Sequence, residues 1–168
     1  MGTSRIVLNV ENALPLPTVT LPEFKSAGAN FTVNSYSFDA ASTEGLQFTI
    51  PFTPGFGSGN ITVNILWYAD TATAGNVVWG ASMLAITPDT DSTDVETDTF
   101  AIESTGHDTH LGTTAQRIHK FPLTLTGTDS LATADYVAFR LFRSGAFGGD
   151  TMAGDAQLVG LYLEYSDT

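Results

Sequence analysis

The chain has 168 residues and a mass of 17.8 kDa, a size typical of one domain with its own hydrophobic core. Hydrophobic residues make up 42% of the sequence and charged residues only 14%, so it is too apolar for a disordered chain and too weakly charged for a typical helical protein. Acidic residues outnumber basic ones by 18 to 6, and the resulting net charge of -12 argues against binding to nucleic acids or anionic membrane surfaces.

The sequence contains no cysteine, which excludes disulfide bonds, thiolate metal sites and cysteine nucleophiles. Residues 1–17 lack the basic start, apolar run and small-residue cleavage site of a signal peptide. No apolar stretch approaches the roughly 20 residues of a membrane-spanning helix. We therefore expect a soluble protein made in a cytoplasm, with no membrane partner.

Residues 1–24 are expected to form an extended arm ahead of a single domain at 25–168. Pro15, Pro17 and Pro22 exclude a helix or a central strand in the arm, because proline fixes its own φ angle and lacks an amide donor. The segment is also rich in apolar side chains, which a solvated tail would not be. Two placements remain open: the arm lies along its own domain or along a neighbouring subunit.

From Asn30 onward, apolar and polar residues alternate in short runs that turn-forming residues separate. The runs, in chain order, are 31–38, 44–52, 60–70, 76–87, 99–104, 116–127, 135–143 and 156–165. Gly80, near the middle of its run, is expected to bend that strand. Trp67 and Trp79 lie in the most apolar runs, so we expect them in the core rather than on a sugar-stacking surface.

About eight strands in one domain of this length predict an all-β fold. The specific expectation is an antiparallel β-sandwich of jelly-roll type with an extended N-terminal arm, because an immunoglobulin-type sandwich needs only about 100 residues. The chain shows no repeat of fixed period, which argues against a propeller or a solenoid.

The segment 106–121 holds all the histidines of the chain, and His107, Asp108 and His110 are candidate binding-loop residues. A zinc site built from three histidines needs ligands that converge at about 2 Å, with a hydrogen-bond acceptor behind each ring. The flanking glycines and threonines oppose a helix that would align the rings, and the spacing does not demand convergence. We expect a surface loop that enters a strand at His119, with a metal site as the alternative and no resident cofactor.

Two other loops have compositions found in ligand sites. An acidic loop at 88–98 resembles a calcium loop in its clustered carboxylates but lacks the glycine and glutamate positions of an EF-hand, so solvated carboxylates are expected and bound calcium is the alternative. The glycine-rich loop at 145–156 contains Phe147, Asp150 and Thr151 and joins two strands, so it lacks the helix N-terminus that binds phosphate. It is expected to be mobile or to make contacts.

Enzymatic activity is not expected, because the chain has neither a nucleophile elbow nor a carboxylate pair with a clear acid and base. Arg140 and Arg143 fall on opposite faces of the predicted strand at 135–143. In a chain this acidic, each is expected to pair with a carboxylate, either within the chain or across a subunit interface.

Two regions of the chain resemble jelly-roll virion proteins of tailed bacteriophages. In 45–70, a strand that ends in a short proline turn precedes a strand with an aromatic residue such as Trp67 or Tyr68. In 135–165, an arginine-ended strand leads through an aspartate-threonine loop to a last strand that closes on tyrosine. The resemblance consists of pattern rather than invariant motif.

The resemblance implies a structural virion protein, made in the host cytoplasm. The main expectation is a capsid decoration (cement) protein that binds the major capsid protein or other virion proteins and its own copies, commonly as a homotrimer. An apolar arm suits this function, since it adds buried area on a neighbour without a new domain. The expected partner-binding residues are those of the arm: Arg5, Ile6, Leu8, Leu14, Leu16 and Leu21.

The alternative expectation is a receptor- or carbohydrate-binding module of a phage tail fibre, head fibre or spike. Its partner would be a host-surface glycan, bound by the loops at 105–114 and 145–154. The candidate contact residues in these loops are His107, Asp108, His110, Phe147, Asp150 and Thr151.

Overall fold

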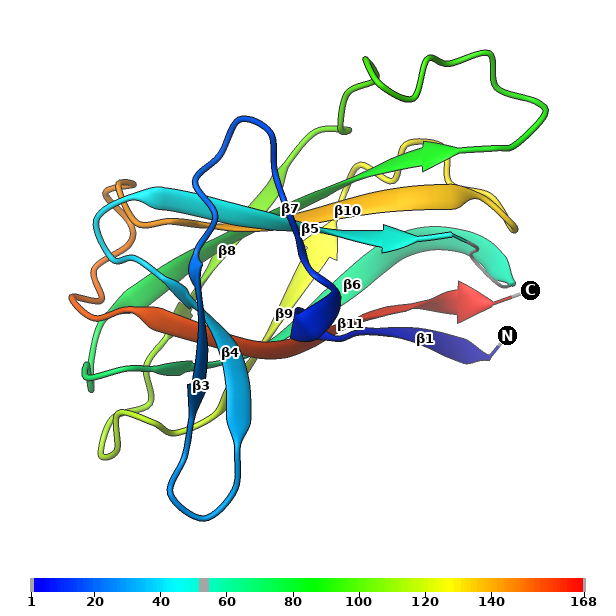
Figure 1. Ribbon diagram of the computed structural model, residues 1–168. Helices are drawn as coiled ribbons and strands as arrows, with labels where there is room; N and C mark the ends of the chain where they lie inside the picture. The colour runs from blue at the N-terminus through cyan, green and yellow to red at the C-terminus, as the bar shows by residue number, and fades with distance from the viewer. Residues whose placement is uncertain (1, 52–54, 168) are drawn as a thin grey trace.

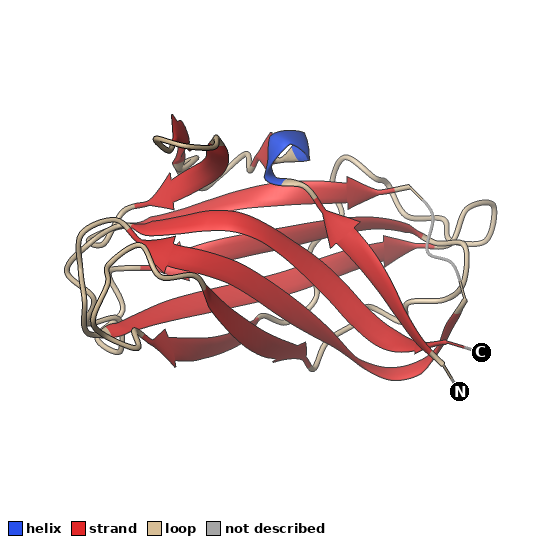
Figure 2. Ribbon diagram, turned by 90° about the horizontal axis from the view of Figure 1, so that it is seen from below, coloured by secondary structure: helices blue, strands red, loops and turns tan. Residues whose placement is uncertain are grey.

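The computed structural model, which describes residues 2–51 and 55–167, is a sandwich of two antiparallel β-sheets (Figure 1). It confirms the expected all-β fold, and Figure 2 shows how strands and loops dominate it. The described part of the chain contains no helix with the length and hydrophobicity of a membrane span. A single turn of 3-10 helix, η1, is formed by Val10–Asn12.

Eleven strands are described, compared with the roughly eight that the alternation predicts. They are β1 (Thr3–Leu8), β2 (Leu14–Pro15), β3 (Glu23–Ala27), β4 (Val33–Phe38), β5 (Thr43–Ile50), β6 (Phe56–Ala69), β7 (Asn76–Ile86), β8 (Ser104–Thr109), β9 (His119–Leu125), β10 (Tyr136–Ser144) and β11 (Ala156–Asp167).

Sheet A has the strand order β3-β4-β11-β6-β9, and β1 also pairs with β11. Sheet B has the order β2-β5-β10-β7-β8. Strand β11 is long enough to pair with β6 along one edge and with two short strands along the other, β4 at Ala156–Leu158 and β1 at Leu161–Ser166. The last strand of the chain therefore holds sheet A together.

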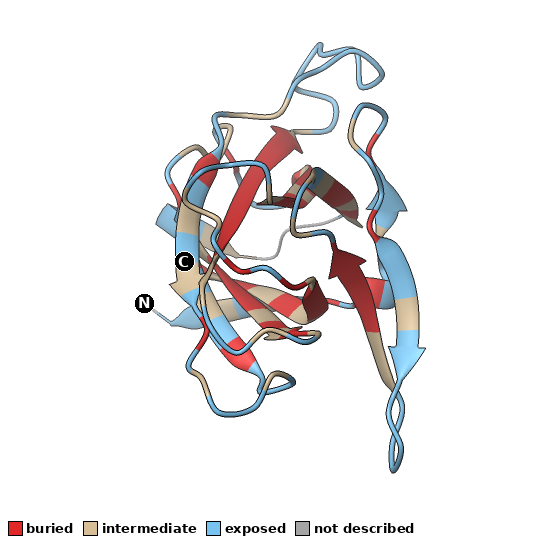
Figure 3. Cartoon of the chain, turned by 90° about the vertical axis from the view of Figure 1, so that its left-hand side faces the viewer, coloured by how far each residue is buried: buried red, intermediate tan, exposed pale blue. Residues whose placement is uncertain are grey.

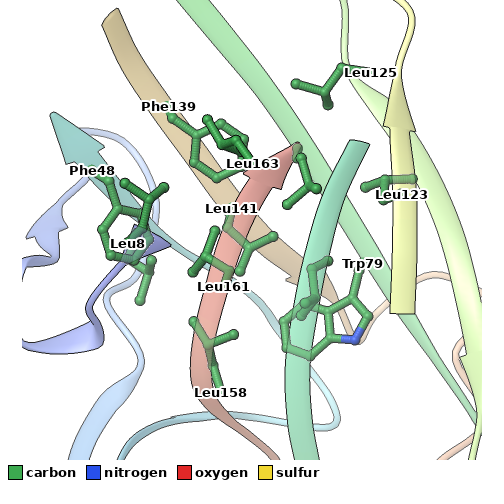
Figure 4. Close-up of a cluster of buried hydrophobic side chains, with 14 of the residues drawn as sticks. Leu8, Phe48, Trp79, Leu123, Leu125, Phe139, Leu141, Leu158, Leu161 and Leu163 are labelled. Atoms are coloured by element: carbon green, nitrogen blue, oxygen red, sulfur yellow. The ribbon is translucent and has the colours of Figure 1, made fainter. Parts of the chain in front are cut away.

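The core lies between the sheets and follows from the period of two in each strand. In β6, the side chains of Ile61, Val63, Ile65 and Trp67 are all buried in it. Figure 4 shows leucines and phenylalanines of both sheets packed around Trp79. The rings of Trp67 and Trp79 meet across the sandwich with centroids 6.5 Å apart, which confirms their expected place in the core.

The N-terminal segment is part of the sandwich rather than a free arm. Strand β1 pairs with β11, β2 pairs with β5, and Gly45 donates its amide hydrogen to the carbonyl of Thr20 at 3.0 Å. Of the two expected placements, the structure therefore has the segment on its own domain.

Several of the expected partner-binding residues are buried or paired within their own domain because of this placement. Leu8 and Leu16 are buried in their own chain, Ile6 is partly buried against the core, and Arg5 donates to Glu164 at 2.8 Å. Leu14 and Leu21 remain exposed. The six residues therefore do not form one continuous exposed surface, because Ile6, Leu8 and Leu16 pack against their own domain.

The outer face of sheet B is covered around Phe142. Phe142 of β10 pairs with Gly45 on one side and with Gly80 on the other, and Leu16 packs on the outer side of Gly45. The missing side chain at Gly80 leaves room for the Phe142 ring, since a Cβ there would lie 2.1 Å from its Cζ atom.

Gly80→Ala is expected to lower the free energy of unfolding by about 1–3 kcal/mol, because the buried Phe142 ring must move. Gly148→Ala is the control, since a Cβ at Gly148 meets no atom within 4 Å, and it should change stability by less than about 0.5 kcal/mol. Urea unfolding of both variants measures the difference. Equal midpoints would show that the ring does not depend on this glycine.

Candidate functional site

The outer face of sheet A carries a row of polar side chains on β4 and β11 that are almost fully buried. The pairing of β11 with β6 and β4 sets Gln157 between Tyr68 and Ser37. Gln157 donates to the Ser37 hydroxyl at 2.6 Å and accepts from the Ser35 hydroxyl at 3.1 Å. Hydrogen bonds between side chains thus fix this row across the sheet.

Two adjoining depressions lie beside the β3–β4 hairpin, which projects from the body in Figure 1 and whose strand β3 and turn are largely exposed in Figure 3. Both are bordered by Phe31, Val33 and Ile118. One has a volume of about 260 Å³, is mostly apolar, and is completed by Ala27, Gly28, Tyr68 and Gln116. The other has a volume of about 420 Å³ and is completed by Asn9, Val10, Glu11, Thr32, Asn34 and Val159. We call the two together the hairpin groove.

Exposed apolar side chains border the groove where its two parts meet. Phe31 is 74% exposed and Ile118 is 61% exposed, far more than the strand residues around them. Val33 and Tyr68 are only half-buried. The groove therefore presents an aromatic ring and a branched aliphatic side chain directly to solvent.

Polar side chains of the groove are held in place by hydrogen bonds. The Asn34 amide donates to Glu11 at 2.5 Å and accepts from the Ser26 hydroxyl at 2.6 Å. The Gln116 amide donates to the carbonyl of Asp70 at 2.7 Å. Among the described residues that line the groove, Glu11 is the only charged one.

The histidine segment differs from the expected surface loop. Its first part is strand β8 at the edge of sheet B, where His107 is exposed and Asp108 accepts a hydrogen bond from the indole of Trp67 at 2.9 Å. His110 is buried, and His119 begins β9 as predicted. Pairing with β7, rather than the local composition, makes the first part a strand.

His110 and His119 form a buried pair beside Trp67. Their ring centroids lie 4.5 Å apart, and His119 stacks on Trp67 at 4.5 Å with an angle of 19° between the planes. The amides of Leu111 and Gly112 donate to His119 Nε2 and His110 Nδ1, both at 3.0 Å. Burial lowers the pKa of His119, and the neighbouring His110 lowers it further.

His110, His119 and Asp108 each contact Trp67 within the fold. Among the described residues, no group of three or more histidine, cysteine or acidic side chains is placed to hold a metal ion. Of the candidate contact residues, His110 and Asp108 therefore support the fold, and His107 alone of the three is exposed. The loop that follows them carries Gln116 and Ile118 to the groove.

The acidic loop uses its carboxylates to cap its own turns. The amides of Thr87, Glu96 and Thr99 donate to the side chains of Asp91, Asp94 and Asp98, respectively. Such local bonds are the usual reason for aspartate in turns.

The glycine-rich loop is fixed to the sandwich by Arg143. All five N–H groups of this buried guanidinium donate: two to the carboxylate of Asp150 at 2.8 and 2.9 Å, and three to backbone carbonyls. Asp150 also accepts from the Val78 amide, and the Thr151 hydroxyl accepts from the Asn76 amide. The side chain of Asp150 is thus fully buried in the fold, whereas Thr151 and Phe147 are exposed, Phe147 to 63%.

Both arginines of β10 pair with carboxylates of the same chain, which is one of the two expected placements; the other is pairing across a subunit interface. Arg143 pairs with Asp150, and Arg140 pairs with Glu103 at 2.6 Å on the other face of β10. The two pairs differ in burial, since both side chains of the first are fully buried while Glu103 is largely exposed.

No protein-family model and no curated protein sequence matches the chain. Among solved structures, a carbohydrate-binding module of family 28, specific for non-crystalline cellulose, is similar with a TM-score of 0.53 and 10% identity over 93% of this chain and 89% of that chain. A family 6 module of a laminarinase from Zobellia galactanivorans matches at a TM-score of 0.42 and 12% identity, over 96% and 98% of the two chains. A family 35 module from Cellvibrio japonicus matches at 0.43 and 12% identity, over 98% and 99%.

The first of these similarities shows a shared fold. It supports the β-sandwich part of the resemblance to phage proteins, whereas the phage part stays a prediction. Sequence patterns missed the hairpin groove, because its residues come from separate parts of the chain. The one local signal is Phe31, an aromatic residue next to a polar turn.

Asp150→Asn is expected to lower the free energy of unfolding by about 3–5 kcal/mol, because it leaves the buried charge of Arg143 without its partner. Glu103→Gln removes the partner of Arg140 at an exposed site and should cost less than about 1 kcal/mol. Chemical denaturation at neutral pH compares the two. A loss in Asp150→Asn no larger than that in Glu103→Gln would contradict the structural role of the loop aspartate.

Proposed function

We propose that this chain is a carbohydrate-binding module that holds a glycan in the hairpin groove. The observation that carries the proposal is the combination of the exposed Phe31 ring with hydrogen-bonded amide and carboxylate groups in one groove beside the β3–β4 hairpin. A sugar ring has apolar C–H faces and a rim of hydroxyl groups. It is therefore recognised by an aromatic surface together with hydrogen-bond donors and acceptors.

The groove offers these two kinds of contact in one continuous surface. Phe31, Val33 and Ile118 supply apolar contact where the two depressions meet. Glu11 and Asn34 lie on one side of this centre, and Gln116 on the other. A glycan lying along the groove would contact apolar side chains at its middle and polar groups toward its ends.

The negative charge of the groove and of the whole chain favours a neutral glycan over an acidic one. The groove has a carboxylate but no lysine or arginine, and the whole chain carries a net charge of -12. Uronic acids and sulfated sugars would be repelled, because like charges raise the free energy of the complex. A neutral glycan is therefore the expected ligand.

The similarity in fold to a cellulose-specific carbohydrate-binding module supports this class of function. The groove of this chain, rather than that similarity, identifies the proposed contact residues. A location on a phage fibre or spike is compatible with the proposal and stays a prediction, as does a trimer. Decoration of a capsid through the N-terminal segment has less support, because Leu8 and Leu16 are buried in their own domain.

Phe31→Ala is expected to weaken binding of a neutral polysaccharide about tenfold, the effect of losing about 1.4 kcal/mol of ring contact. A panel of neutral and acidic polysaccharides identifies the ligand, and titration calorimetry then gives the dissociation constants. Phe147→Ala is the matched control, since this ring is similarly exposed but lies outside the groove. It should leave the affinity unchanged.

Two results would contradict the assignment. Binding lost in Phe147→Ala and kept in Phe31→Ala would move the site to the glycine-rich loop. Failure of the unmodified protein to bind any glycan of the panel would remove the proposed function itself.

A further inference from the structure

One wall of the hairpin groove is attached to the body of the protein through two uncharged imidazoles. The loop at 111–118 supplies Gln116 and Ile118 to the groove. The first two amides of this loop donate to His119 Nε2 and His110 Nδ1. A ring nitrogen that accepts such a hydrogen bond carries no proton of its own.

The accepting nitrogens fix the protonation of both rings. His110 accepts at Nδ1 and donates from Nε2 to the carbonyl of Ala115 at 3.1 Å, so it bonds to the loop at both nitrogens. His119 accepts at Nε2, so its one proton lies on Nδ1. A second proton on either ring would meet an amide hydrogen that already points at the same nitrogen.

The surroundings of the pair give an added proton little compensation. The rings are only 5% and 3% exposed, and Trp67 of β6 covers His119 with an uncharged indole. Asp108 on β8 favours a charged His119, but its carboxylate is already the acceptor for Trp67. His110 and the guanidinium of Arg117 oppose the charge, whereas the backbone of Arg117 favours it by a hydrogen bond.

We propose that the His110–His119 pair is a proton-operated latch on the hairpin groove. When His119 takes up a proton in acid, the amide of Leu111 loses its acceptor and the loop at 111–118 leaves the body. The groove then loses Gln116 and Ile118, and the glycan is released. The effect on the glycan rests on the proposed function, whereas the opening of the loop rests on the imidazole geometry alone.

The direction of the pH effect follows from linkage. Burial holds the pKa of His119 below its ordinary value, so below about pH 6.5 an open or unfolded segment binds more protons than the closed one. The closed loop is therefore fully stable above about pH 6.5 and loses stability as the pH falls below that value. The latch is closed at neutral pH and opens in acid.

Amide hydrogen exchange, followed by NMR between about pH 7.5 and about pH 4.5, tests the latch without any ligand. After correction for the intrinsic pH dependence of exchange, the amides of Leu111 and Gly112 should lose protection in acid. The amide of Leu161 in the central strand β11 should keep its protection, which distinguishes local opening from global unfolding. Binding of the neutral polysaccharide should weaken about tenfold over the same range.

Substitutions without a titrating group should keep the loop closed. His119→Gln places an uncharged amide near Nε2, and His110→Asn places a carbonyl oxygen at the position of Nδ1, where it accepts from the amide two residues later. The double variant should keep both amides protected in acid. His107→Gln, at the exposed histidine on β8, is the matched control and should open like the unmodified protein.

Unchanged protection of Leu111 and Gly112 in acid would overturn the latch, and this result needs no variant. Acid opening that persists in the double variant would overturn it as well. Failure of the proposed function looks different, because no glycan would then bind at about pH 7.5, where the loop is closed.

Discussion

Burial of one face of each sheet against the other is the constraint on which the rest of this structure depends. It commits every second side chain of the central strands to the core, including Trp67 and Trp79. Any ligand must therefore use an outer face or the loops. On sheet B the outer face is occupied by Phe142 and Leu16, and on sheet A the polar side chains of Ser35, Ser37 and Gln157 are buried, so the hairpin groove is the surface left for recognition.

The hairpin groove is connected to the core by a series of ring contacts. Ring contacts run from Trp79 through Trp67 and His119 to His110, with centroid separations of 6.5, 4.5 and 4.5 Å. The loop that completes the groove is bonded to the last two rings of this series. A wall anchored in this way is rigid while the imidazoles are neutral, and the same bonds make its position depend on their charge.

The alternation of side chains predicted the fold class and most strands, because a period of two is a local property of a half-buried strand. It missed β1, β2, β3 and β8, and the predicted run at 99–104 is not a strand before Ser104, where β8 begins. Prolines near β2 opposed a strand, yet Pro15 is accommodated in a two-residue pairing at the edge of sheet B, where a missing amide donor costs little. The groove had no local signature, since Glu11, Phe31 and Ile118 meet only in the folded chain.

The contrast between Asp150 and Glu11 explains why acidic loop residues were poor guides to the site. Asp150 attracted notice in a glycine-rich loop, but its carboxylate accepts from Arg143 and a backbone amide and is fully buried, so a ligand cannot reach it. Glu11 sits in an unremarkable segment, is exposed, and receives a hydrogen bond from Asn34. In a chain with few cations, most carboxylates satisfy buried or turn donors. Glu11 lines the proposed groove from the 3-10 turn η1, where its exposed carboxylate can meet sugar hydroxyls and repels acidic sugars by its charge.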